Sequence, residues 1–122
     1  MATVLVVDDE ADLRVLITTM LRMAGHEVVE AEGGEAALAA MAAMKVDVVL
    51  LDLMMPAMDG WSFLQSCRGN TGSAHIPIGL LSAAPVLLKT ADAWGVQVAI
   101  GKPFALETLI EQVERLVDPV CL

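Results

Sequence analysis

The chain has 122 residues, of which 57% are hydrophobic, and it carries a formal net charge of −9 with a pI near 4.4. This length predicts a single domain over residues 1–122 with a core of its own. The charge, set against only seven Lys and Arg, repels a phosphate backbone and argues against direct binding of nucleic acid. Acids interrupt every apolar run before the roughly 18 residues that a membrane helix needs, and no basic segment precedes the first run. We therefore expect a cytoplasmic protein that does not contact a membrane.

Short apolar runs rich in β-branched residues alternate along the chain with longer segments of helical period. The runs are TVLVV (3–7), EVVEA (27–31), VDVVLL (46–51), IPIGLLS (76–82) and VQVAI (96–100). This alternation predicts repeated βα units around a parallel sheet. The crossovers are accommodated most economically when helices cover both faces of a doubly wound sheet.

Helical period is clearest after the first run and in the last segment. Apolar residues with the spacing of one helical face are Leu13, Leu16, Ile17, Met20 and Leu21 in the first of these, and Leu106, Leu109, Ile110, Val113 and Leu116 in the second. We interpret both stripes as faces that pack on the core. The stretch AALAAMAAM (36–44) favours a packed or half-exposed helix over a Met-rich binding groove, because Ala is the strongest helix former and Met fills gaps. Gly25 and the Gly33-Gly34 pair mark turns.

Acidic side chains follow two of the predicted strands. Asp8 and Asp9 end the first run, and Asp52 ends the third. Because the carboxyl ends of parallel strands lie on one rim of a sheet, we expect these three side chains to be neighbours. Clustered carboxylates repel one another unless a cation lies among them, and Mg²⁺ suits such a place because it takes oxygen ligands and keeps several waters. Ca²⁺ is disfavoured because the EF-hand pattern is missing.

Two further groups at the same rim can complete a site for a phosphoryl group. Ser82 ends the fourth run and Lys102 follows the fifth, so that a hydroxyl and a fixed positive charge can bind phosphoryl oxygens. Asp52 is then the candidate nucleophile, since carboxylates form aspartyl phosphates. The competing interpretation is that Asp9 or Asp12 caps the following helix. A cap explains Asp9 taken alone equally well, but the whole set of strand-end groups favours a site.

These motifs resemble the receiver domain of two-component response regulators. The resemblance rests on VLVVDDE (4–10), VVLLDLMMPAMDG (48–60), LLSA (80–83) and GKPF (101–104), which occur in the family's order and spacing and cover nearly the whole chain. It implies a doubly wound (βα)5 fold of the flavodoxin-like or CheY-like kind. In that fold a five-stranded parallel sheet has the order 2-1-3-4-5, with helices on both faces.

The resemblance also implies a Mg²⁺-dependent phosphoacceptor. Asp52 would receive a phosphoryl group from a histidine kinase, a phosphotransfer protein or a small donor such as acetyl phosphate. Asp52, Asp9 and the backbone carbonyl of Met54 would bind Mg²⁺ directly, and Asp8 would act through water. Such a domain is a signalling protein rather than an enzyme, and it catalyses at most its own phosphorylation and dephosphorylation.

Ser82 corresponds to the family's switch hydroxyl and Lys102 to its phosphate-binding lysine. One position departs from the family, because Ala99 stands where an aromatic residue usually serves as a switch, and the chain contains no Tyr. This departure motivates the alternative of an interaction domain that works without phosphorylation. A phosphatase of the aspartyl-phosphate kind is disfavoured because Met54 takes the place of its second acid. The expected partners are a histidine kinase or phosphotransfer protein, a downstream effector domain or protein, and a second copy of the chain in a homodimer.

Overall fold

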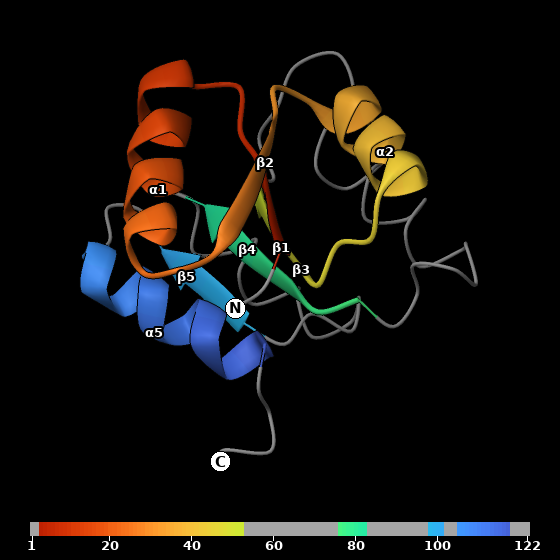
Figure 1. Ribbon diagram of the computed structural model, residues 1–122. Coiled ribbons are helices and arrows are strands. Elements are labelled where there is room, and N and C mark those ends of the chain that lie inside the picture. The colour runs from red at the N-terminus through yellow and green to blue at the C-terminus, as the bar shows by residue number, and fades with distance from the viewer. Residues whose placement is uncertain (1–2, 53–75, 83–97, 102–104, 118–122) are drawn as a thin grey trace.

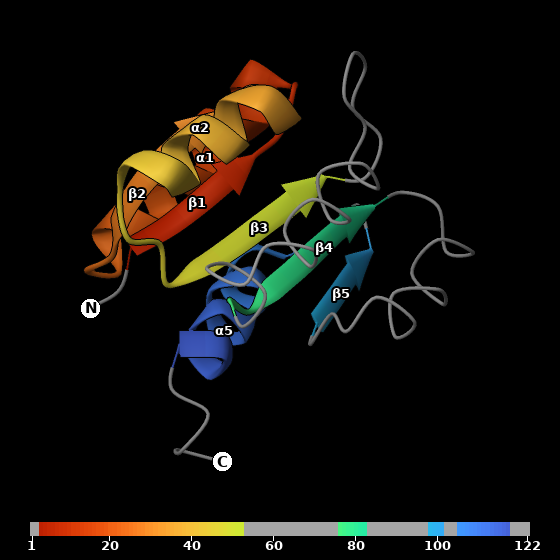
Figure 2. The same ribbon diagram turned by 90° about the vertical axis from the view of Figure 1, so that its right-hand side faces the viewer.

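The structure, a computed structural model, describes residues 3–52, 76–82, 98–101 and 105–117. Its elements in chain order are β1 (Thr3–Val7), α1 (Ala11–Met23), β2 (Glu27–Ala31), α2 (Gly34–Ala43), β3 (Val48–Asp52), β4 (Ile78–Ser82), β5 (Val98–Gly101) and α5 (Leu106–Val117). All strand pairs are parallel, and the sheet has the order β2-β1-β3-β4-β5 (Figure 2). The predicted fold class and strand order are therefore confirmed.

Helices cover both faces of the sheet, with α1 and α5 on one side and α2 on the other (Figure 1). Alternate residues of β1 face the two sides, as the pleat requires. Val4 and Val6 pack with residues of α1 and α5, whereas Leu5 and Val7 pack in the cluster that α2 covers. All four of these side chains are fully buried, as are residues of β3 on both faces, which explains why these strands read as continuous apolar runs.

Among the strands whose preceding residues the structure describes, two begin later than the sequence predicts. The third strand starts at Val48 rather than residue 46, and the side chain of Asp47, just before it, accepts the N–H of Thr3 at 2.9 Å. The fourth strand starts at Ile78 rather than residue 76, because Pro77 has no N–H to donate to the ladder. In both cases the residue before the strand still makes a main-chain bond across the sheet, from the Asp47 N–H to Thr3 O at 2.9 Å and from the Val49 N–H to Pro77 O at 3.0 Å.

The predicted core face of α1 is wrong at one position. Ile17 and Leu21 are fully buried, and Leu13 packs at the edge of the same cluster, but Leu16 is 46% exposed. The buried stripe therefore follows a spacing of four residues, and Thr18, next to Ile17, is also buried in the middle of the helix.

In the described part of the chain, no helix is both long enough and apolar enough to cross a membrane.

Gly25 closes α1 with a left-handed residue, at φ 98°. The N–H of Gly25 donates to Arg22 O at 3.0 Å, and the N–H of His26 donates to Leu21 O at 3.1 Å. This pair of bonds is a Schellman motif, which satisfies carbonyls at the helix end and turns the chain into β2.

We expect Gly25→Ala to destabilise the protein. A Cβ at this residue would meet nothing within 4 Å, so its cost is conformational, about 1 kcal/mol of unfolding free energy. Gly25→Asn is the matched control, since Asn adopts the left-handed conformation more readily than other residues that carry a Cβ. Its unfolding free energy should fall by less than that of Gly25→Ala. Urea unfolding followed by circular dichroism measures both, and equal effects would show that the positive φ does not set the cost.

Candidate metal and phosphoryl site

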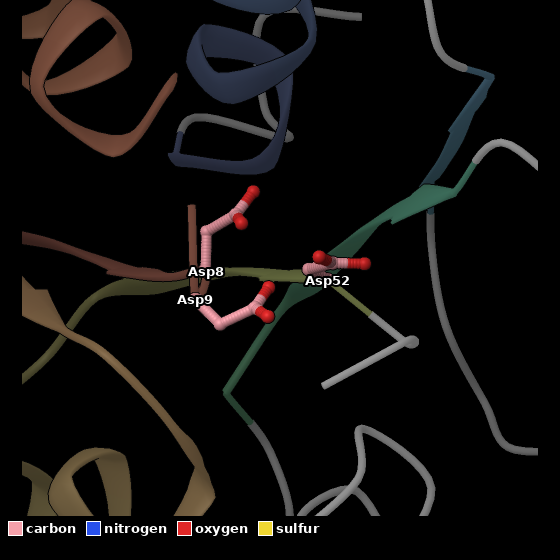
Figure 3. A group of neighbouring side chains, drawn as sticks. All are labelled: Asp8, Asp9 and Asp52. Atoms are coloured by element: carbon pink, nitrogen blue, oxygen red, sulfur yellow. The ribbon is translucent and has the colours of Figure 1, made fainter. Parts of the chain in front are cut away.

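The three acids singled out in the sequence lie together at the carboxyl rim of the sheet (Figure 3). Asp8 directly follows β1 and Asp52 is the last residue of β3, and these two strands are paired in register with Val7 opposite Leu51. One carboxylate oxygen from each of Asp8, Asp9 and Asp52 lies within 4.8 Å of the others. The predicted clustering of the three carboxylates is thus confirmed.

The three carboxylates differ in their surroundings. Asp8 is fully buried and Asp52 is 5% exposed, whereas Asp9 is exposed. In Figure 3 the carboxylate of Asp9 extends toward Asp52 across the gap between the two strand ends. The cluster therefore combines two buried carboxylates, of Asp8 and Asp52, with the solvent-exposed carboxylate of Asp9. An incoming ion or phosphoryl donor can approach from the exposed side.

Asp8 has a structural role at the start of α1. Its Oδ1 accepts the N–H of Glu10, the N-cap residue, at 2.9 Å. The Glu10 side chain makes no capping bond of its own. The capping function that the sequence offered to Asp9 or Asp12 is therefore carried in part by Asp8, and one oxygen of Asp8 is engaged in it.

The backbone of the acidic turn is held from both sides. The N–H of Asp8 donates to Ala31 O on β2 at 3.2 Å, and the carbonyl of Asp8 accepts Nη1 of Arg14 at 2.7 Å. Nε of the same guanidinium bonds Oε1 of Glu30 at 3.1 Å. Arg14 was not singled out in the sequence, although a lone cation in the first turn after an acid pair is a usable signal in a chain with seven Lys and Arg.

The other predicted site residues are placed only in part. Ser82 is the last residue of β4, so its backbone lies on the same rim, one strand beyond Asp52. Its partner in β5 is Gly101, the residue before Lys102. Lys102 and Met54 lie outside the described residues, and their roles stay predictions.

A hollow of about 590 Å³ lies at the opposite end of the sheet, away from the acids. Arg22, His26 and Lys45 contribute to its lining. Arg22 is in the last turn of α1 and Lys45 follows α2, so both cations lie where carboxyl-terminal helix dipoles attract positive charge. The helix dipoles account for the positions of these two cations, and we assign no ligand to this hollow.

The strand order reverses at β1 and β3, so the acidic cluster lies at the switch point of the sheet. An α/β domain of this class binds ligands at that point, outside the carboxyl ends of its strands. The sequence matches the response regulator receiver domain family over residues 4–114, and the chain belongs to this family. It is a receiver domain of the two-component response regulator type, and such domains generally use Mg²⁺ at an acidic pocket.

Relatives and solved structures agree with this assignment. The chain is 37% identical over 120 residues to a probable transcriptional regulator ycf27 of Porphyridium aerugineum, covering 94% of this chain and 49% of that protein. It is 30% identical over 118 residues to the DNA-binding dual master transcriptional regulator RpaA of Synechocystis, with 95% and 49% covered. The chain thus spans about half the length of these curated relatives. The structure of Vibrio cholerae chemotaxis protein CheY4 matches with a TM-score of 0.88 at 34% identity, covering 95% of this chain and 98% of that one.

Proposed function

We propose that Asp52 is the phosphoacceptor of this receiver domain and that its phosphorylation requires Mg²⁺. The observation that carries the proposal is the convergence of Asp8, Asp9 and Asp52, whose carboxylate oxygens lie within 4.8 Å of one another at the switch point. Asp52 lies at the end of a fully buried strand, so its carboxylate has a fixed position on the rim. A fixed nucleophile is what phosphoryl transfer chiefly asks of a protein, because catalysis there rests on positioning and charge stabilisation.

The donor set fits Mg²⁺. Carboxylate oxygens are the ligands that this ion prefers, and it needs only one or two of them because it keeps several waters. We assign direct contacts to Asp9, Asp52 and the backbone carbonyl of Met54, and a water-mediated contact to Asp8. The burial of Asp8 and its bond to the N–H of Glu10 support the indirect role, since one of its oxygens is already engaged. When bound, the ion would neutralise charge on the phosphoryl oxygens.

The transfer step is a displacement at phosphorus. A carboxylate oxygen of Asp52 attacks the phosphorus, the P–N bond of a phosphohistidine or the P–O bond of acetyl phosphate breaks, and the leaving group takes the bonding pair. In this proposal the Lys102 ammonium and the Ser82 hydroxyl bind phosphoryl oxygens. The protein catalyses at most its own phosphorylation and the later hydrolysis of the aspartyl phosphate to Asp52 and inorganic phosphate, and the phosphorylated protein is a signalling state.

The partners in this proposal are a histidine kinase or phosphotransfer protein as donor and an effector domain or protein as the target of the signal. Val15 and Leu16 are 54% and 46% exposed on α1, the helix that begins beside the acids, and they offer apolar contact area for a donor protein. A second copy of the chain is a further candidate partner.

Ala99, which pairs with Leu80 across β5 and β4, replaces the usual aromatic switch, so the output surface is expected to respond through other side chains. We also propose that the protein acts in the cytoplasm.

The intact mass of the protein after incubation with acetyl phosphate tests the proposal. We expect one phosphoryl adduct in the presence of Mg²⁺ and none when the ion is removed with a chelator, because the ion is needed to offset the charge of the donor and the acids. A folded protein that binds Mg²⁺ yet acquires no adduct from acetyl phosphate or from a histidine kinase would favour the interaction domain that works without phosphorylation. Binding of a partner with and without a phosphoryl analogue would then be compared.

A further inference from the structure

Arg14 connects three parts of the rim that surrounds the acids. From the first turns of α1 its Nη1 donates to the carbonyl of Asp8 at 2.7 Å, and its Nε bonds Glu30 of β2 at 3.1 Å. The Arg14 side chain is 16% exposed and that of Glu30 is 32% exposed, so the pair is partly shielded from water. Because the guanidinium is a rigid fork, two bonds at neighbouring donors fix its orientation as well as its position.

The bond to Asp8 acts on Asp9 through the peptide between them. The carbonyl of Asp8 and the N–H of Asp9 belong to one planar unit, so holding the carbonyl fixes the direction in which the chain enters Asp9. The other side of Asp8 is held by its N–H bond to Ala31 O at 3.2 Å. Asp9 is the exposed member of the cluster. Within the described residues its backbone is oriented by this bonding of Asp8 from both sides, together with the bond that the Glu10 N–H donates to Asp8 Oδ1.

We propose that Arg14 is a positioning residue of the cation site, which holds the Asp8–Asp9 peptide so that the Asp9 carboxylate is preorganised to bind Mg²⁺. This inference rests on the proposed function of the acidic cluster. Residues that orient metal ligands through hydrogen bonds commonly change metal affinity by about 10- to 100-fold when they are replaced. Arg14 bonds the backbone beside a ligand rather than the ligand itself, so we place its effect at the low end of that range.

Charge and geometry predict opposite effects of replacing Arg14, and this makes the inference testable. Removing a positive charge near three acids raises their attraction for a cation, whereas loosening the turn lowers it. Glu30 pairs with the guanidinium, so the ion pair as a whole adds little net charge to the site. Salt separates the two effects further, because the screening length falls from about 10 Å at 0.1 M to about 3 Å at 1 M ionic strength.

The experiment measures the dissociation constant of Mg²⁺ for the full chain from the rise of its melting temperature with ion concentration, at 0.1 M and at 1 M NaCl. Arg14→Lys keeps the charge and loses the fork, and we expect it to weaken Mg²⁺ binding by about tenfold at both salt concentrations. Arg14→Met should weaken binding by at least as much at 1 M NaCl, where the effect of the lost charge is screened. Glu30→Gln keeps an acceptor for Nε and should produce a smaller change that high salt removes.

Arg22→Met is the matched control. Arg22 also reaches from α1 to β2, donating from Nη2 to Val28 O at 3.3 Å, but at the end of the helix away from the acids. It should lower stability without changing the dissociation constant of Mg²⁺ by more than about twofold, since it touches nothing at the rim. Wild-type affinity in Arg14→Lys, or tighter binding in Arg14→Met at low salt alone, would overturn the positioning role. Failure of the wild-type protein to bind Mg²⁺ would instead overturn the proposed function, and this inference with it.

Discussion

Asp52→Asn is expected to abolish the phosphoryl adduct that acetyl phosphate and Mg²⁺ form on the wild-type protein. The amide has no oxygen that can act as the nucleophile in forming an acyl phosphate, yet it matches the carboxylate in size, so the buried end of β3 should remain intact. Intact-protein mass spectrometry measures the adduct. Asp52 is 5% exposed and clustered with two other acids, so removal of its charge should also leave the unfolding free energy equal to that of the wild type or higher in the absence of the ion.

Asp12→Asn is a suitable control for this prediction. Asp12 lies in the first turn of α1, close in sequence to the acid pair, but it is exposed and outside the cluster. Its replacement should leave the adduct unchanged. An adduct that persists in Asp52→Asn and maps to another carboxylate would show that the nucleophile is misassigned, whereas the site on the rim would stand.

The fold follows from the sequence where packing on both faces sets the pattern. β1 and β2 have the bounds that the runs at 3–7 and 27–31 predict, because β-branched residues dominate the first, a Val-Val pair forms the centre of the second, and an acidic residue follows each. Periodicity is less informative at Leu16, since a stripe spaced by three and four residues has two edges and the neighbouring elements decide which edge is buried. The start of a strand also depends on hydrogen-bond partners across the sheet, and apolar runs do not specify these.

The acids could be predicted because a simple rule places them. Parallel strands share one rim, so Asp8, Asp9 and Asp52 meet regardless of their distance along the chain. The contact of Arg14 with Glu30 could not be predicted in the same way. It requires the register of β1 on β2, in which Val6 lies opposite Glu30, together with the rotation of α1 over that pair. Residues that support a site depend on such details, whereas the residues that form it follow from topology.

Mg²⁺ is expected to raise the melting temperature of the protein, and Asp9→Asn is expected to lose most of that rise. An ion that binds the native state alone stabilises it by about 1.4 kcal/mol at ten times its dissociation constant, or roughly 5 °C for a domain of this size. The exposed Asp9 carboxylate extends toward Asp52, so its removal takes a direct ligand from the ion. Differential scanning calorimetry with MgCl2, against NaCl at equal ionic strength, separates specific binding from screening.

The second half of this prediction concerns the protein without Mg²⁺. The Asp9 carboxylate stabilises the fold when the ion is bound and destabilises it when no ion is bound. With the cluster empty, Asp9 repels two acids whose oxygens lie within 4.8 Å of its own, so Asp9→Asn should raise the melting temperature in chelator. Asp12→Asn removes a charge from the same helix start without relieving any repulsion in the cluster. It should lower the melting temperature slightly, since an acid in the first turn interacts favourably with the helix dipole. If Asp9→Asn lowers the apo melting temperature as Asp12→Asn does, Asp9 stabilises the start of α1 and the cation has to be held by Asp52 and its other neighbours. A rise in chelator together with a lost response to Mg²⁺ would identify Asp9 as a ligand that destabilises the fold until the ion binds.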